Sequence, residues 1–281
     1  MRLGFAILVF CSIKWETGNL APVSPDDADA SGLANFINLN FFIGMKAVLL
    51  WQVVTALGLL AYVGSMLPVA GLFPALFFAL GIDALNASQG ASNHSTQLVS
   101  MILVGQYLVY ALPFSARPGR RRSPLWLMPD DVIHRRAIYV SLVIFAAGYV
   151  VCGWVKLSNS DWAWIWNVVP GLALELQKTN WSAYYDTLEP VPAVLTTVVG
   201  LMNDHPMLAR LFFGAGLLIE LGAFLIMMGR RWAFWYGLAI IVLHLSISRL
   251  MQLDFWYHIF AALIFVVNVP GIKRTFAGGR R

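Results

Sequence analysis

Long apolar runs separated by short polar segments dominate the hydropathy pattern of the chain. A helix needs a length of about 20 apolar residues to cross a bilayer. Seven runs come close to this length, and one run at the N-terminus is shorter. Each run is continuous rather than alternating, which favours helices over the strands of a β-barrel. The pattern predicts an all-α, polytopic integral membrane helical bundle of about eight spans: Leu3–Ile13, Phe41–Met66, Pro68–Leu85, Gln97–Phe114, Ala137–Lys156, Pro206–Met228, Trp232–Leu250 and Phe255–Val269.

Composition supports a lipid environment. Of the 281 residues, 59% are hydrophobic and 12% are charged, with a mean hydropathy of +0.71. Soluble domains carry about 25% charged residues, so one globular core cannot hide this much apolar surface. We expect the lipid bilayer as a partner and a single transmembrane domain over residues 1–281. The net charge of +5 reports orientation, and no nucleic-acid partner is expected.

Basic residues cluster in alternate loops, which predicts the orientation of the chain. Cytoplasmic loops carry an excess of lysine and arginine. Threading eight spans places the basic residues on one side and most acidic residues on the other, with both termini in the cytoplasm and residues 270–281 as a basic cytoplasmic tail. We expect the inner (plasma) membrane of a bacterium. The clustered residues are Arg2, Arg117, Arg120, Arg121, Arg122, Arg135, Arg136, Arg230, Arg231, Lys273, Arg274, Arg280 and Arg281.

The longest exterior segment, residues 158–205, is rich in aromatic side chains. Amphipathic rings favour the headgroup layer of a membrane. Its apolar piece Ala193–Met202 is too short to cross. We therefore expect an exterior amphipathic segment that lies on the membrane surface as a lid, with Trp162, Trp164, Trp166, Trp181, Tyr184 and Tyr185 as its rings.

Several ionisable residues fall inside or at the ends of the predicted spans, where charge is costly and often functional. His244 is expected near the midplane of its span and Glu220 towards the cytoplasmic half. Snorkelling from helix ends explains some of these residues equally well, and His244 could serve as an interhelical hydrogen-bond donor. The residues expected in the outer third are Lys46, Asp83, His94, Lys156, Arg249, Asp254 and His258.

One predicted hairpin carries two pairs of polar residues at helical spacing. His244 and Ser248 are one turn apart, as are Asp254 and His258 if the last span begins by Asp254. A carboxylate at that spacing can orient an imidazole and fix its tautomer. A purely structural network would have the same spacing. The scattered histidines match no metal-binding pattern, so we expect no metal.

Two parts of the chain carry a recognisable pattern. One reads "CGWVKLSNSDW", and the other consists of "ELGAFLIMMGRRW" and "VLHLSISRLMQLDFWYHIF". Both resemble the vitamin K-dependent γ-carboxylase-like superfamily, also called the horizontally transferred transmembrane (HTTM) domain. The resemblance implies that Lys156 in the first part is the catalytic base, and that Glu220 and His244 in the second are further catalytic positions. The chain resembles a compact member without the family's large extracytoplasmic domain.

The resemblance implies a quinol-linked redox or carboxylase-type enzyme with a reduced, vitamin K-like quinone as cofactor. In the family, a lysine deprotonates the quinol, oxygen attacks the ring, and the resulting strong base takes a proton from the substrate. An amine needs dry surroundings to act as a base near neutral pH, and the indole-rich segment would supply them. The expected quinone pocket contains His94, Asp83, Arg249, Asp254, His258, Trp154 and Trp162.

Two other functions stay open. A membrane maturation or immunity factor for an exported peptide or protein would use the exterior aromatic segment and no quinone. A transporter would show interrupted helices in matched halves. Pro68 and Pro74 interrupt one region, but no second repeat matches it.

Overall fold

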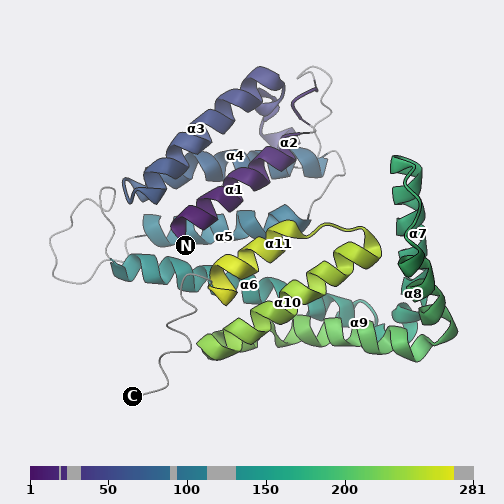
Figure 1. Ribbon diagram of the computed structural model, residues 1–281. Helices are drawn as coiled ribbons and strands as arrows, with labels where there is room; N and C mark the ends of the chain where they lie inside the picture. Colours follow the sequence, from purple (N-terminus) through teal and green to yellow (C-terminus); the bar gives the residue numbers. More distant parts are fainter. Residues whose placement is uncertain (19, 24–32, 89–93, 113–130, 269–281) are drawn as a thin grey trace, which may run out of the picture. The chain divides into compact units, whose positions relative to one another are not determined.

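The computed structural model describes residues 1–18, 20–23, 33–88, 94–112 and 131–268. Every regular element in these ranges is a helix, which confirms the all-α class. The predicted tail of residues 270–281 and the arginines at 117 and 120–122 lie outside the described residues. The helices are α1 (Arg2–Glu16), α2 (Leu33–Phe36), η1 (Asn40–Phe42), α3 (Met45–Val63), α4 (Pro68–Ser88), α5 (His94–Ala111), α6 (Asp131–Ser158), η3 (Trp164–Val168), α7 (Val169–Thr187), α8 (Ala193–Asp204), α9 (Pro206–Leu221), η4 (Gly222–Met228), α10 (Arg230–Met251), α11 (Trp256–Ala261) and η5 (Ala262–Val267) (Figure 1).

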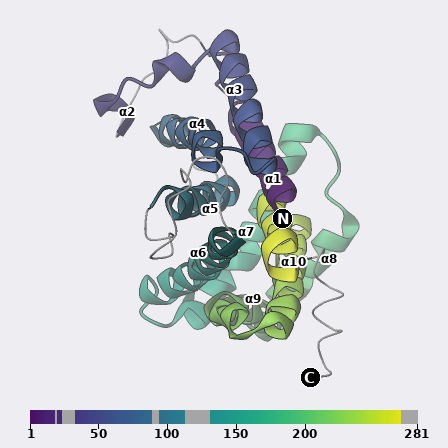
Figure 2. The same cartoon turned by 90° about the vertical axis from the view of Figure 1, so that its left-hand side faces the viewer.

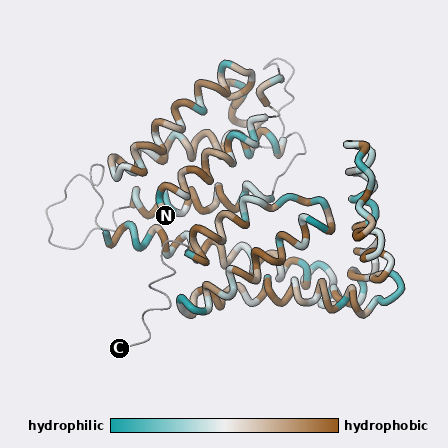
Figure 3. The backbone as a smooth tube through the Cα atoms, in the orientation of Figure 1, coloured by the Kyte–Doolittle hydropathy of each residue, from teal (hydrophilic) through white to brown (hydrophobic). Residues whose placement is uncertain are grey.

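Five helical stretches in these ranges are long and apolar enough to cross a membrane, which indicates a multi-pass integral membrane protein. Many of their large apolar side chains point outwards, as lipid-facing residues do; Leu218, for example, is 70% exposed. In Figure 3 the tube through these helices is mostly brown. The five stretches are Met45–Val63, Pro68–Ser88, Asp131–Ser158, Pro206–Met228 and Arg230–Met251.

The other three predicted spans are shorter or more polar in the described part of the chain. Helix α1 has 15 residues, and α5 has 18 residues but begins with the polar stretch "HSTQ". The last apolar helix, Trp256–Val267, falls in the class of 10–17 residues. The count of eight spans therefore stays a prediction.

The described residues pack as two compact units, Met1–Phe145 and Ala146–Val267, and α6 contributes to both. In the first unit, α4 packs against α1, α3 and α5, and α1 lies along α3 (Figures 1 and 2). Helices α3 and α4 cross where two glycines meet. A Cβ atom on Gly58 would lie 2.4 Å from the carbonyl oxygen of Gly71, so only glycine permits this approach.

Buried hydrogen bonds tie the helices of the first unit together. The carboxylate of Glu16 accepts bonds from Asn86 Nδ2 at 2.6 Å and Thr96 Oγ1 at 2.8 Å, which joins α1, α4 and α5. Gln106 accepts a bond from the Tyr62 hydroxyl at 2.7 Å and donates to Ser141 Oγ at 3.0 Å. Satisfied polar groups of this kind fix helix positions where lipid tails give no hydrophobic drive to association.

In the second unit, α9 and α10 lie side by side (Figure 1), and the chain after α9 tightens into the 3₁₀ segment η4. The Tyr236 hydroxyl of α10 donates to the carbonyl of Ile219 at 2.7 Å, which satisfies a backbone acceptor near this change. Helices α7 and α8 pack on α9 through a small core that includes Leu176, Val199 and Leu217. Helix α7 is more hydrophilic than the spanning helices, as its teal and white stretches in Figure 3 show.

Candidate functional site

The most prominent polar contact in the second unit joins Lys156 to Glu220, 64 residues apart. Lys156 Nζ lies 2.5 Å from Glu220 Oε1 and 2.6 Å from Oε2, so both carboxylate oxygens accept from one ammonium group. Lys156 belongs to the last turn of α6, and Glu220 is the penultimate residue of α9. The lysine side chain is 37% exposed and the glutamate 13%, so the carboxylate depends on this partner more than the amine does.

Glycine and tryptophan residues shape the surroundings of the pair. A Cβ atom on Gly153 would lie 2.9 Å from the side chain of Leu221 and 3.2 Å from Glu220 Cβ. The missing side chain at Gly153, one turn before Lys156, lets α9 approach α6 closely enough for the pair to form. The Lys156 amine also lies 5.5 Å from the ring centroid of Trp164, within cation–π range.

This contact corrects the depths that the sequence suggested. Lys156 was expected in the outer third of the membrane and Glu220 in the cytoplasmic half, yet their charged atoms touch. The two residues therefore lie at one level, and the prediction that they lie at different depths was wrong. It assumed that every apolar run begins at the membrane surface, whereas α9 reaches the end of α6 only after most of its length.

A buried tyrosine–histidine pair lies two turns earlier on α6. The Tyr149 hydroxyl and His244 Nε2 are 2.5 Å apart. His244 is only 5% exposed, and its Nδ1 atom has no hydrogen-bond partner among the described residues. Tyr149 and Lys156 are seven residues apart, which puts them on the same side of the helix about 10 Å apart along its axis. This hydrogen bond between α6 and α10 is of the interhelical kind that the sequence left open for His244 as an alternative to a functional role.

Rings from the segment that follows α10 pack around His244. The ring of His258 lies 5.0 Å from that of His244 and 5.9 Å from that of Tyr149, and Phe255 packs 5.0 Å from His244. Asp254 was expected to sit one helical turn before His258. Helix α11 begins only at Trp256, so this helical spacing is absent, and Asp254 Oδ1 accepts a bond from Ser248 at 2.9 Å.

The remaining predicted site residues fall into two groups. In the second unit, Arg249 is exposed, and the exposed rings of Trp154 and Trp162 meet edge to face at 5.3 Å. Asp83 and His94 belong to the first unit, on α4 and α5, and are not among the contacts described above. His94 Nδ1 pairs with Gln97 at the exposed start of α5. The described residues contain no cluster of histidine, cysteine and acidic side chains that could hold a metal.

Sequence reasoning missed two residues of this site, Tyr149 and Gly153, and placed Trp164 in the exterior segment without specifying its contact with Lys156. The helical spacing contained a signal for the first two, because Tyr149, Gly153 and Lys156 recur at spacings of four and three along α6. The contact of Trp164 depends on the turn after α6, which spacing does not predict. Glu16 also differs from what the predicted orientation implies for most acidic residues, which is an exterior loop, because it ends α1 and is buried.

The site has an ion pair and a tyrosine–histidine pair on one face of α6. The ammonium and carboxylate can exchange a proton, because the donor and acceptor atoms are in direct contact. The partly exposed amine can also meet a second molecule. No family model matches the chain, and no curated protein or solved structure matches it either.

Proposed function

We propose that the chain is a membrane enzyme of the vitamin K-dependent γ-carboxylase-like superfamily, in which the Lys156–Glu220 pair accepts a proton from a reduced quinone. One observation carries this proposal: two of the three residues that the family resemblance singled out, Lys156 and Glu220, are in direct contact, at 2.5 Å, although 64 residues separate them. The third singled-out residue, His244, is bound to Tyr149 on the same helix as Lys156.

The surroundings of Lys156 fit a flat, lipophilic guest. The amine is 37% exposed, so a second molecule can reach it, and the Trp164 ring covers another side. Trp154 and Trp162 are 54% and 63% exposed on the neighbouring turns and offer faces on which an aromatic ring can stack. These residues would hold the quinol headgroup, while its tail would stay among the lipids.

The proton transfer balances within the pair. The carboxylate of Glu220 takes a proton from the Lys156 ammonium, which leaves a neutral amine beside a protonated acid. The amine then accepts the proton of a quinol hydroxyl. The pair now holds one more proton than before, and the substrate holds one fewer. The quinol supplies the reducing power, with molecular oxygen as the oxidant.

The topology belongs to the same proposal. We place the chain in the inner membrane of a bacterium with eight spans, both termini in the cytoplasm, and residues 158–205 on the exterior surface. The alternation of basic and acidic loops supports this orientation. The exposed aromatic side chains of α7, such as Trp181 and Tyr185, suit a position at the headgroups.

A quinol-oxidation assay tests the proposal. Purified protein in lipid vesicles receives vitamin K hydroquinone and oxygen, and oxidation is followed by absorbance. Lys156→Ala and Glu220→Gln should each lower the rate at least about 100-fold, the usual contribution of one acid–base group. Lys178→Ala is the matched control, since it breaks the exposed ion pair with Glu175. Full rates in both site variants would refute the proposal.

One observation favours a second function, binding of an exported peptide. A pocket of about 220 Å³ between α7 and α8 has three amide residues in its lining, Gln177, Asn180 and Asn203, beside apolar ones. Beside it, Trp181, Tyr184 and Tyr185 form an aromatic cluster with ring distances of 5.5–6.2 Å. Amide groups and aromatic faces are the usual partners of peptide backbone and side chains.

Photo-crosslinking separates the two functions. A photoreactive amino acid in place of Trp154 and another in place of Trp181 would be activated in intact cells that make the protein. Attachment of a quinone at position 154 supports the enzyme. Attachment of a secreted peptide at position 181, with no quinone at 154, supports the peptide-binding factor.

A further inference from the structure

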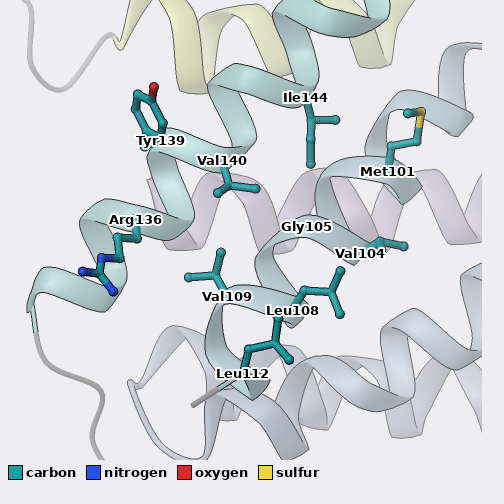
Figure 4. A pocket seen from close by; sticks show the side chains of 10 residues that line it. All are labelled: Met101, Val104, Gly105, Leu108, Val109, Leu112, Arg136, Tyr139, Val140 and Ile144. Carbon is teal, nitrogen blue, oxygen red and sulfur yellow. The ribbon is translucent and has the colours of Figure 1, made fainter. Parts of the chain in front are cut away.

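An apolar groove runs between α5 and α6 in the first unit. It has a volume of about 630 Å³ (Figure 4). Its walls are almost entirely aliphatic, with Val104 and Leu108 from α5 facing Val140 and Ile144 from α6. Its one charged lining residue among the described residues is Arg136.

The groove is polar at one end and apolar at the other. Figure 4 shows Arg136 and Tyr139 towards one end and Ile144 with Met101 towards the other. Tyr139 is 59% exposed, and an amphipathic phenol of this kind favours the headgroup layer. From Arg136 to Ile144, helix α6 rises about 12 Å. The groove thus has one charged end and an apolar length, which matches the charged headgroup and apolar chains of a membrane lipid.

The walls are held in place without an occupant. Gly105 allows the two helices to approach, since a Cβ atom there would lie 2.2 Å from Ile144 Cδ1. Two hydrogen bonds tie α5 to α6: the Tyr110 hydroxyl with His134 Nδ1 at 2.8 Å, and Gln106 Nε2 with Ser141 Oγ at 3.0 Å. A preformed groove saves a ligand the cost of ordering its own site.

We infer that this groove binds one anionic phospholipid, with an acyl chain along Val104, Leu108 and Val140 and the phosphate at Arg136. Helix α6 is long and apolar enough to cross a membrane, where acyl chains would be available to the groove. A guanidinium matches a phosphate with two parallel hydrogen bonds. The inference rests on membrane insertion alone and is independent of the proposed quinol chemistry.

Charge, not the acyl chain, sets the selectivity. Lipid tails are as apolar as leucine, so moving a chain from the bilayer into the groove gains little. One arginine near the surface favours an anionic lipid by a free energy that corresponds to about a five-fold preference over a zwitterionic lipid. The preference should therefore disappear with the charge of Arg136, while general retention of lipid should disappear when the groove is filled.

Native mass spectrometry of the full chain, released from detergent with equal amounts of phosphatidylglycerol and phosphatidylcholine, tests this inference. The wild type should retain one lipid and prefer phosphatidylglycerol about five-fold. Arg136→Gln should bring the ratio close to one, and Arg136→Lys should keep most of it. Arg135→Gln is the matched control. It removes the same charge from the preceding residue of α6, which does not line the groove.

A second variant tests the position of the acyl chain. Leu108→Trp fills the groove and should abolish retention of both lipids, whereas Leu57→Trp, at an exposed position of α3, should leave it unchanged. Three outcomes would overturn the inference: no preference in the wild type, an equal loss in Arg135→Gln and Arg136→Gln, or a dimer that Leu108→Trp dissociates. The last outcome would assign the groove to a second copy of the chain.

Discussion

At the scale of single residues, the central finding is that Lys156 has a carboxylate partner. An isolated lysine at a helix end is explained by snorkelling, but a lysine whose nitrogen contacts both oxygens of a glutamate is committed to one geometry. Glu220 is the more buried member, at 13% exposure. Removing the amine therefore leaves an unpaired carboxylate with little access to water, and such a carboxylate destabilises the folded protein.

Breaking the pair from the lysine side should destabilise the protein. Lys156→Met should lower the free energy of unfolding by about 2 kcal/mol, because Glu220 loses its counter-charge. The double variant Lys156→Met with Glu220→Gln should recover most of this loss, since no charge is then left alone. Unfolding in mixed micelles, followed by circular dichroism, measures both. Additive losses would show that the two side chains do not interact.

At the scale of helices, the site depends on a close crossing of α6 and α9. Gly153 provides the space, and the change from α9 to the 3₁₀ segment η4 follows directly after Glu220 and Leu221. The geometry of the pair is thus set by backbone packing as much as by charge. A larger side chain at Gly153 has no room unless the side chain of Leu221 or the helix α9 moves.

Gly153→Leu should separate the helices and break the ion pair while leaving both charged residues in place. We expect quinol oxidation to fall at least about 100-fold, as it does when an acid–base group is removed. Gly200→Leu serves as the control, because no heavy atom lies within 4 Å of a Cβ atom built at that glycine of α8. If Gly153→Leu oxidised quinol as fast as the Gly200→Leu control, the close crossing of α6 and α9 would not matter for the site.

The helices were largely predictable from the sequence, and their contacts were not. Continuous apolar runs predicted Pro206–Met228 with the bounds that the structure has, and Pro68–Ser88 begins where expected. Hydropathy reports how long an apolar run is, but not which face of it meets another run. Hydropathy also does not report how far along its length one run meets another, and the separate depths predicted for Lys156 and Glu220 failed for that reason. The role of Tyr149 as the partner of His244 was not predictable, because the sequence does not distinguish a tyrosine that faces lipid from one that faces a histidine.

At the scale of the whole molecule, the account depends on how often the chain crosses the membrane. In the part of the chain that the structure describes, five helical stretches meet the length and hydropathy that crossing requires, and the proposal of eight spans adds α1, α5 and the α11–η5 stretch. An odd total would put the two termini on opposite sides. The side of the C-terminus therefore separates eight crossings from five or seven.

Reporter fusions decide this point in a bacterial host. Green fluorescent protein and alkaline phosphatase, each fused after Arg281, report cytoplasmic and periplasmic locations respectively. With the N-terminus shown to be cytoplasmic by the same method, eight spans predict a fluorescent C-terminal fusion and an inactive phosphatase. The reverse pattern would exclude eight spans and the proposed orientation.

The most direct test of the central claim is the rate of quinol oxidation by Lys156→Arg. Arginine keeps the positive charge and pairs with a carboxylate through two hydrogen bonds, but its guanidinium is not deprotonated in proteins. If the pair transfers a proton, this variant should fold with wild-type stability and oxidise quinol at least about 100-fold more slowly. A Lys156→Arg protein that keeps the wild-type rate would show that the ion pair only holds the helices together.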